Sequence, residues 1–471
     1  MRERASAAAV VSVLAGGLLA GALTVLGAET GPLVPLVLLA AAGVVLLALL
    51  WPLGAVYLAV LCIPLESVSA RFGQGAFGLS PTEGIALIAA GGCVLHRLCR
   101  GGGSFRSPLT VPFVLLLVAH VPGLFFASDR FAVVKELVMW SAFFILFLAI
   151  VAAPGGTQRL AAALAASGAI VAAVAVVKTG GKAQFASDLG GFVSDRATGS
   201  FAAPTLLGVF IAMLIPLQLV YVVRGPRAWH RALGLVAVAV SLLALALTET
   251  RSAFLAISVA VAWMTLVWRP FRRFGIAAAV LAAVVLFTGL NPAPGVVNMA
   301  TLRDRVASVS STETYTAQLR LALWRETPRM IEDNLPWGVG ADNFVDRAPQ
   351  YGAVGPGGLP YTHAHDVPLT VAAELGLPGL ASLVWIVLAL AGLLVRAFKA
   401  PDERTRALGV ALSASFLAIG VDGIFDYAFS DNAFFLTVIL FAALAARVGR
   451  PEPATAENRA PAALGMDPMP A

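Results

Sequence analysis

Long apolar blocks recur along most of this chain and constrain its fold more than any other feature. Leu, Val, Ala and Ile fill runs of about 17–25 residues, the length that a helix needs to cross ~30 Å of hydrocarbon. The runs do not alternate apolar and polar residues, as the strands of a membrane β-barrel would. Only 12% of the 471 residues are charged, so most of the chain cannot face water. The sequence therefore predicts an all-α polytopic membrane protein.

We expect about 12–14 transmembrane helices and one long extracytoplasmic loop that carries short helices. The apolar spans are 8–28, 32–50, 53–66, 81–97, 109–127, 132–152, 159–177, 203–223, 231–249, 252–268, 274–291, 366–395, 406–425 and 432–447. The predicted parts are N-terminal transmembrane helices (1–177), transmembrane helices with outer-face arginines (178–291), the extracytoplasmic loop (292–365), C-terminal transmembrane helices (366–450) and a disordered cytoplasmic tail (451–471).

The distribution of basic residues orients the spans. Cytoplasmic loops of membrane proteins carry an excess of Lys and Arg, whereas long segments are exempt from this rule. With the N-terminus inside, 19 of the 32 Lys and Arg residues fall in inner segments, and nine more fall in two long outer segments, 178–202 and 292–365. The sequence thus predicts a multi-pass protein of the cytoplasmic (inner) membrane with cytoplasmic N- and C-termini.

Two arginines stand where predicted spans meet the outer surface. The segment TETRS (248–252) interrupts an otherwise apolar stretch and leaves Arg251 between two spans. Either its side chain extends to lipid headgroups, or its planar guanidinium binds a phosphate. Arg196 precedes a span inside the Gly-, Ser- and Asp-rich segment 178–202, which is either a flexible connector or part of a site.

A cluster of ionisable residues opens the next long span, in HAHDVPLTVAAELGLPGL. His363, His365, Asp366 and Glu374 lie at the membrane boundary, where such residues indicate function. A helix that starts near His363 would place His363, Thr370 and Glu374 on one face. Two histidines at this spacing can bind a metal, but no third ligand is evident nearby, so we expect no metal. The other interpretations are water-facing polar residues and a histidine base or proton relay.

The long outer segment 292–365 has a helical pattern in its middle. Apolar residues of TYTAQLRLALWRETPRMIEDN repeat at spacings near 3 to 7, which predicts one or two helices along the membrane surface. Arg320 and Arg325 on this helix are either solvated charges or part of an acceptor groove. Gly338 and Gly340 in PWGVGADNF lack the strand-turn-helix context of a nucleotide loop and indicate a tight turn instead.

Several segments, in this order, resemble the O-antigen ligase and polymerase superfamily. They are DRATGSFAAPTLLGVFIAML, TETRSAF, RLALWRETPRMIEDNLPWGVGADNF and HAHDVPLTVAAELGLPG, within residues 190–390. The resemblance implies a polytopic helical glycosyltransferase. Such enzymes transfer a glycan from an undecaprenyl-diphosphate-linked donor to an acceptor on the outer face of the membrane. Ligases, polysaccharide polymerases and protein O-oligosaccharyltransferases all belong to this superfamily.

The resemblance also implies a set of site residues. The outer-face arginines of the family map to Arg196 and Arg251, and its histidine maps to His365, followed here by Asp366 where the family usually has Asn, Ser or Gln. His365 and Arg251 are the expected catalytic residues, and Arg196 and Arg251 the expected diphosphate ligands. The candidate supporting residues are His363, Asp366, Glu374, Arg320 and Arg325.

The partners expected from this resemblance are lipids and glycans. They are a polyprenyl-diphosphate-linked glycan donor, a glycan, lipid or protein acceptor, and membrane lipids, with no nucleic acid. The implied enzyme inverts the anomeric centre and uses neither a metal nor another cofactor.

A membrane transporter or flippase of a small anion or glycolipid is the alternative hypothesis. The number of spans and the charges of Glu66, Glu83 and Asp422 within apolar surroundings motivate it. Transporters often contain internal repeats, but the two halves of this chain show no convincing repeat. The polar residues also cluster at the outer face rather than at mid-membrane, which favours the enzyme.

Overall fold

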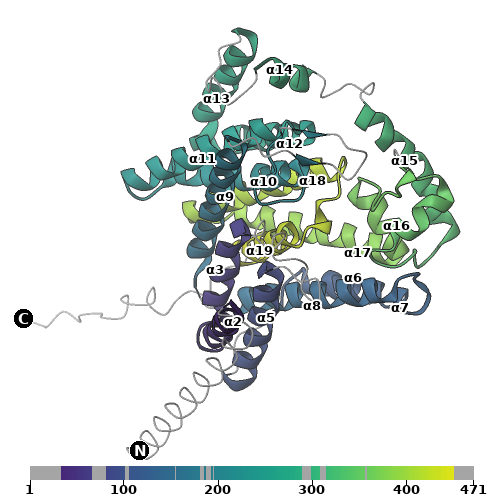
Figure 1. Ribbon diagram of the computed structural model, residues 1–471. Coiled ribbons are helices and arrows are strands. Elements are labelled where there is room, and N and C mark those ends of the chain that lie inside the picture. Colours follow the sequence, from purple (N-terminus) through teal and green to yellow (C-terminus); the bar gives the residue numbers. More distant parts are fainter. Residues whose placement is uncertain are drawn as a thin grey trace, which may run out of the picture.

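The computed structural model describes residues 33–65, 81–100, 106–153, 155–180, 185–186, 193–194, 196–288, 299–307, 315–355 and 358–449. The regular secondary structure in these ranges is helical (Figure 1), apart from one pair of two-residue strands and an isolated bridge. Six of the described helices are long and apolar enough to cross a membrane, and five shorter apolar helices accompany them. The predicted all-α polytopic fold is confirmed. The predicted span 8–28 and the tail 451–471 lie outside the described residues.

The described apolar helices begin and end close to the predicted spans. They are α2 (Leu33–Leu50), α3 (Pro52–Cys62), α5 (Pro81–Arg100), α6 (Thr110–His120), α8 (Arg130–Ala152), α9 (Thr157–Gly180), α10 (Pro204–Arg224), α11 (Ala228–Thr248), α12 (Arg251–Val267), α13 (Arg269–Thr288), α17 (Val367–Phe398), α18 (Glu403–Gly423) and α19 (Asn432–Val448). The shorter elements are η1 (Ile63–Leu65), α7 (Gly123–Phe126), α14 (Met299–Ala307), α15 (Tyr315–Asp333), α16 (Phe344–Arg347), η2 (Ala348–Tyr351), η4 (Ala428–Ser430) and the antiparallel strands β1 (Phe185–Ala186) and β2 (Val193–Ser194).

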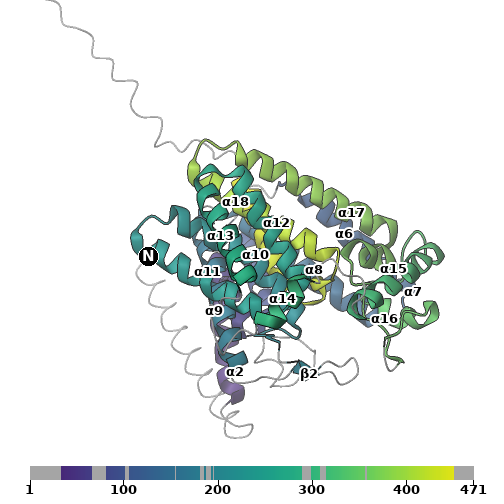
Figure 2. The same ribbon diagram turned by 90° about the horizontal axis from the view of Figure 1, so that it is seen from above.

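Helix α10 forms the centre of the bundle. Every residue from Leu207 to Gln218 is buried, and the helix packs against α9, α11, α12 and α18. A helix that is apolar all round is stable only when it is enclosed in this way. Helix α17 runs beside α6 and α18 (Figure 2). One end of the bundle carries α7, α15 and α16, and we call it the loop-bearing end (Figure 1).

Helix α17 breaks at Gly376, inside the predicted span 366–395. Gly376 has φ 63° and ψ −158°, and Pro378 lacks the N–H that would bond the carbonyl of Glu374. The PWGVG turn replaces the missing bonds with its own backbone. Its Val339 and Gly340 N–H groups donate to the carbonyls of residues 373 and 374 at 2.8 and 2.9 Å, and Pro336 accepts from the N–H of residue 377 at 2.9 Å. The predicted tight turn thus holds the two pieces of α17 together.

A side chain at position 376 is expected to destabilise the protein. Gly376→Ala would occupy a backbone region that only glycine adopts readily, at a cost on the order of 1–3 kcal/mol, and its Cβ would collide with the carbonyl oxygen of Pro336. Gly392→Ala, in the same helix, is the matched control because a Cβ there meets no atom within 4 Å. Thermal unfolding in detergent should give a lower midpoint for Gly376→Ala only. Equal midpoints for the two variants would contradict this role of the break.

Candidate functional site

The TETRS corner between α11 and α12 brings the two predicted arginines together. Glu249 ends α11 with φ 50°, and Thr250 precedes the first residue of α12, Arg251. Arg196 donates from Nε to the carbonyl of Thr248 at 2.7 Å and from Nη2 to Oγ1 of Thr250 at 3.0 Å. Two donors of Arg196 therefore fix the corner, and Arg251 follows Thr250 directly in the chain.

Helix α17 does not start near His363, the start that would have placed His363, Thr370 and Glu374 on one face, but close to residue 366, where the predicted span begins. Helix α17 begins at Val367, because Asp366 caps it by accepting the N–H of Leu369 at 2.7 Å and Pro368 occupies the first turn. His363 and His365 therefore lie in a loop and share no helical face with Glu374. Asn and Ser cap helices about as well as Asp, so Asp366 can perform the structural task of the residues usual at this position.

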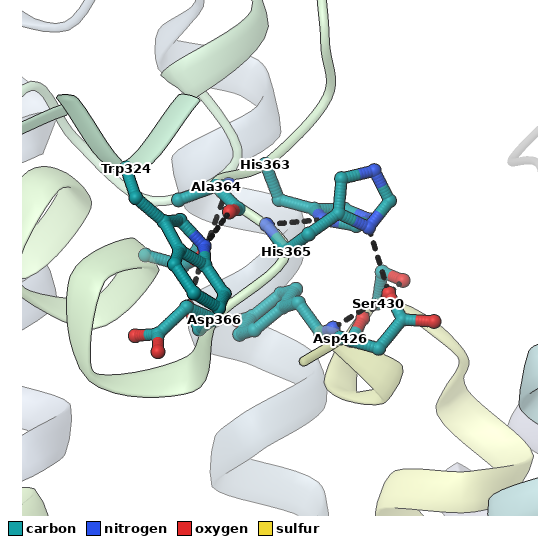
Figure 3. Close-up of polar contacts among 9 residues, drawn as sticks. Trp324, His363, Ala364, His365, Asp366, Asp426 and Ser430 are labelled. Carbon is teal, nitrogen blue, oxygen red and sulfur yellow. Dashed lines mark hydrogen bonds and ion pairs between the residues drawn. The ribbon is translucent and has the colours of Figure 1, made fainter. Parts of the chain in front are cut away.

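His365 is held by a carboxylate that comes from a distant part of the chain. Its Nδ1 lies 2.8 Å from Oδ1 of Asp426, 61 residues later, in the turn that follows α18 (Figure 3). His365 itself has φ 51°, an uncommon conformation for a residue other than glycine. With the Nδ1 proton donated to Asp426, Nε2 is free to accept a proton, and it points away from the carboxylate in Figure 3. This is the geometry of an oriented general base.

The surroundings of the pair set the charges of Asp426 and His363. Burial opposes ionisation of Asp426, but the hydrogen bond from His365 and the nearby His363 and Arg320 together hold the pKa of this carboxyl below its usual range. Burial lowers the pKa of His363 to about 3; the charges of His365 and Arg320 add to this effect, and Asp426 opposes it. Asp426 is therefore ionised and His363 neutral near pH 7.

His363 packs directly against the base. The centroids of the His363 and His365 rings are 4.3 Å apart, and Nδ1 of His363 accepts the backbone N–H of His365 at 3.3 Å. The ring of Tyr427 lies 5.4 Å from that of His363 on another side. These contacts limit the rotation of both imidazoles.

The structure also supplies the third metal ligand that the sequence did not reveal. One candidate ligand atom from each of His363, His365 and Asp426 lies within 4.8 Å of the others. Two imidazoles and a carboxylate are a donor set that divalent transition metals accept. The positive charge of Arg320 beside the three residues opposes a cation, and the 2.8 Å hydrogen bond favours a histidine base.

Of the two arginines predicted on the loop helix, only Arg320 joins the site. Helix α15 is confirmed, and a five-residue separation places its arginines about 140° apart around the helix. Arg325 is exposed. Arg320 is half-buried and lies close enough to His363 and Asp426 to act on both electrostatically.

Glu374 anchors a loop, and within the described part of the chain it makes no hydrogen bond or ion pair with the histidines. Oε1 of its buried carboxyl group accepts the N–H of Phe344 at 3.4 Å. Nearby, the Asn343 side chain accepts the N–H of Asp129 at 2.7 Å and donates to the carbonyl of the same residue at 3.0 Å. These contacts join α17, the PWGVGADNF segment and the start of α8 at the loop-bearing end.

One acidic residue connects the histidine and arginine halves of the site. Asp422 lies in the last turn of α18, is 1% exposed, and neighbours Asp426, Arg320 and Ser252, the residue after Arg251. It was one of the acidic residues that motivated the transporter hypothesis. Of the others, Glu83 accepts a hydrogen bond from Asn432, and Glu66 lies outside the described residues.

We call residues 363–366, which precede α17, the histidine loop. An apolar cavity of about 530 Å³ ends beside it, at Val367 and Pro368. Its lining includes Val367 and Pro368 at the start of α17 and Val395 and Phe398 near its end, together with residues of α6, α18 and α19. It therefore extends along the greater part of a membrane-spanning helix. Such a space suits a long hydrocarbon chain whose polar end lies near Asp366.

Comparison with known proteins gives one family match. The model of a family described as O-antigen ligase matches residues 236–384. This range contains Arg251, Arg320 and His365, and it excludes Arg196 and Asp426. No curated protein matches the chain.

Proposed function

Through residues 236–384 this chain belongs to the O-antigen ligase/polymerase superfamily, and we propose that it transfers or polymerises a glycan from an undecaprenyl-diphosphate-linked donor on the outer face of the cytoplasmic membrane. The general role of glycan ligase or polymerase follows from the family. We propose three further points: the identity of the donor, the face of the membrane on which transfer takes place, and the residues that carry out the reaction.

The observation that carries the proposal is the position of the His365–Asp426 pair. It lies beside the end of the apolar cavity, and Asp422, four residues before Asp426, neighbours Ser252 in the first turn of α12. A lipid-linked donor needs three features in one place: a space for its tail, cations for its diphosphate and a base for the acceptor. In this proposal the cavity along α17 takes the tail, Arg196 and Arg251 supply the cations, and His365 is the base.

In this mechanism the donor is bound by its lipid tail and its diphosphate. The tail occupies the cavity along α17, which keeps the diphosphate at the level of the corner. Arg251 binds the phosphate oxygens through its planar guanidinium. Arg196 adds positive charge and, through its bonds to Thr248 and Thr250, keeps the corner in place. The arginines oppose the negative charge that develops on the leaving diphosphate.

His365 acts on the acceptor. Its Nε2 takes the proton of an acceptor hydroxyl as that oxygen attacks the anomeric carbon of the donor sugar. The bond between this carbon and the phosphate oxygen breaks, and its electron pair leaves with undecaprenyl diphosphate. Asp426 stabilises the resulting imidazolium through Nδ1. Attack opposite the leaving group inverts the anomeric centre, and no metal takes part in any step.

The test is glycan release by the purified protein. The protein in lipid nanodiscs is incubated with undecaprenyl-diphosphate-linked oligosaccharide extracted from its host, with and without EDTA. We expect undecaprenyl diphosphate to be released in both conditions, and the size of the glycan product separates polymerase from ligase. Arg251→Gln should slow release by roughly 10²–10³-fold. If folded protein releases none from this donor, the proposal is wrong and solute flux into proteoliposomes becomes the next measurement.

The comparison with and without EDTA tests whether the reaction needs a metal. Activity that EDTA abolishes and that an added divalent cation restores would contradict the metal-free mechanism. It would instead assign His363, His365 and Asp426 to a metal site.

A further inference from the structure

Four large apolar side chains are exposed at the loop-bearing end, and the mechanism above uses none of them. Phe125 in α7 and Phe131 in the first turn of α8 are 72% and 71% exposed, and Trp337 of the PWGVG turn and Leu377 of α17 are about half exposed. We call these four residues the rim. Exposed apolar groups that gather in one region mark an interaction surface.

The segments that carry the rim are packed on one another. The PWGVG turn and the residues after it contact the corner between α7 and α8. A Cβ at Gly340 would lie only 2.6 Å from that of Ala127, and the Asn343 side chain bonds both the N–H and the carbonyl of Asp129. The same turn accepts the N–H of Leu377 at 2.9 Å. The α7–α8 corner, the PWGVG turn and the break in α17 therefore form one unit.

The rim continues the exposed apolar faces of two helices of the bundle. Helices α6 and α7 lie within one apolar stretch, Thr110–Phe126, and its exposed residues recur at spacings of 3 and 4, namely Val111, Val114, Val118, Val121 and Phe125. After the break in α17, exposed residues recur at spacings of 7 and 4, namely Leu377, Val384 and Leu388. Residues at these spacings share one side of a helix. In a polytopic membrane protein lipid covers such sides, and each reaches the rim at the loop-bearing end.

Helix lengths place the rim at the edge of the hydrocarbon. Helix α8 has 23 residues from Arg130 to Ala152, roughly 35 Å at 1.5 Å per residue, which is enough to cross ~30 Å of hydrocarbon. The part of α17 after its break, 377–398, has nearly the same length and carries Arg396 in its last turn. Before the break, residues 371–376 are all buried in protein and face no lipid. Both helices therefore leave the hydrocarbon at the rim.

We propose that the rim inserts into the lipid headgroup boundary of the leaflet at the loop-bearing end, so that the hydrocarbon ends at the break in α17. The partner is the lipid surface itself. Tryptophan is enriched at such boundaries, and an arginine there extends its charge into water, as the exposed Arg130 beside Phe131 can do. The histidine loop then lies on the water side of the boundary, where a glycan can reach it. The rim has this role whatever reaction the site catalyses.

Fluorescence quenching measures the depth of the rim. The three natural cysteines of the full chain are replaced by alanine, and Phe125→Cys, Trp337→Cys and Leu377→Cys are each labelled with the environment-sensitive fluorophore NBD in phosphatidylcholine nanodiscs. Quenching by lipids with a nitroxide at known depths is compared with quenching by iodide in water. Leu388→Cys, on the same side of α17 as Leu377, is the control for hydrocarbon. Gln350→Cys, exposed in η2, is the control for water.

The three rim labels should lie about 15 Å from the bilayer centre, half of the ~30 Å hydrocarbon thickness. The label at Leu388 should lie roughly 16 Å deeper than the label at Leu377, since the helix rises by 1.5 Å per residue. The label at Gln350 should respond to iodide only, and so should Thr362→Cys, which is exposed beside the histidine loop.

Three results would overturn the proposal. Rim labels that respond to iodide as strongly as the label at Gln350 would place the rim in water. Rim labels as deep as the label at Leu388 would move the hydrocarbon boundary beyond the break in α17. Rim labels shielded from both quenchers would indicate that protein, such as a second copy of the chain, covers the rim instead of lipid. If Trp337→Cys does not fold, the labels at Phe125 and Leu377 decide by the same criteria.

Discussion

His365→Gln should lower the rate of glycan transfer by roughly 10²–10⁴-fold, the typical contribution of a positioned general base. Glutamine is close in size but cannot accept the proton of the acceptor hydroxyl at the position of Nε2. Binding of undecaprenyl diphosphate should stay near the parental value, because the proposed ligands of the diphosphate are Arg196 and Arg251. The measurement is the rate of undecaprenyl diphosphate release at saturating donor, together with donor affinity.

A histidine away from the site provides the control. His96 bonds the carbonyl of Leu49 at 3.0 Å, outside the loop-bearing end, and His96→Gln should transfer glycan at the parental rate. Parental activity in His365→Gln would exclude His365 as the base. Equal losses in rate and in donor affinity would instead indicate that the histidine loop shapes the donor site.

Asp426→Asn should lower the rate by a comparable factor, roughly 10²–10⁴-fold, although the side chain keeps its shape. An asparagine can donate its amide N–H to Nδ1, which stabilises the tautomer that carries its proton on Nε2 and so blocks the base. It also removes the negative charge that stabilises the imidazolium. The double variant with His365→Gln should be about as slow as His365→Gln alone, because the two residues act as a unit.

Asp431→Asn is the matched control for this substitution. Asp431 caps α19 by accepting the N–H of Phe434 at 2.9 Å, and asparagine caps helices about as well as aspartate. Asp431→Asn should therefore be active and stable. If Asp426→Asn were also fully active while His365→Gln was not, the carboxylate would not be the group that orients the base.

Stability of the Asp426 variant should depend on pH. The pKa of Asp426 is lowered in the folded protein, so its charge stabilises the fold above its unfolded pKa of about 3.9. The difference in stability between parent and Asp426→Asn should be full near neutral pH. It should shrink in stronger acid, as Asp426 of the parent becomes protonated.

The sequence by itself determined the elements of this protein and half of its site. Apolar runs long enough to span a bilayer have only one low-energy state in lipid, a helix, so the spans follow from composition and length. The TETRS corner and the histidine loop were found because polar residues interrupt or end such runs. Arg196 was noted from its place just before a span, its role as a diphosphate ligand was implied by the family resemblance, and the structure brings it to the corner that carries Arg251.

Only the tertiary structure decided which side chains meet. Asp426 was missed because its partner His365 lies 61 residues away, and no periodicity within one helix connects residues across two elements. The choice of Arg320 over Arg325 depends on which face of α15 is docked, and that face is set by Trp324 and Ala364. Glu374 was expected beside the histidines and instead holds Phe344, because α17 starts at Val367 and breaks at Gly376. Local sequence specifies the helices, whereas long-range packing decides how they bring charges together.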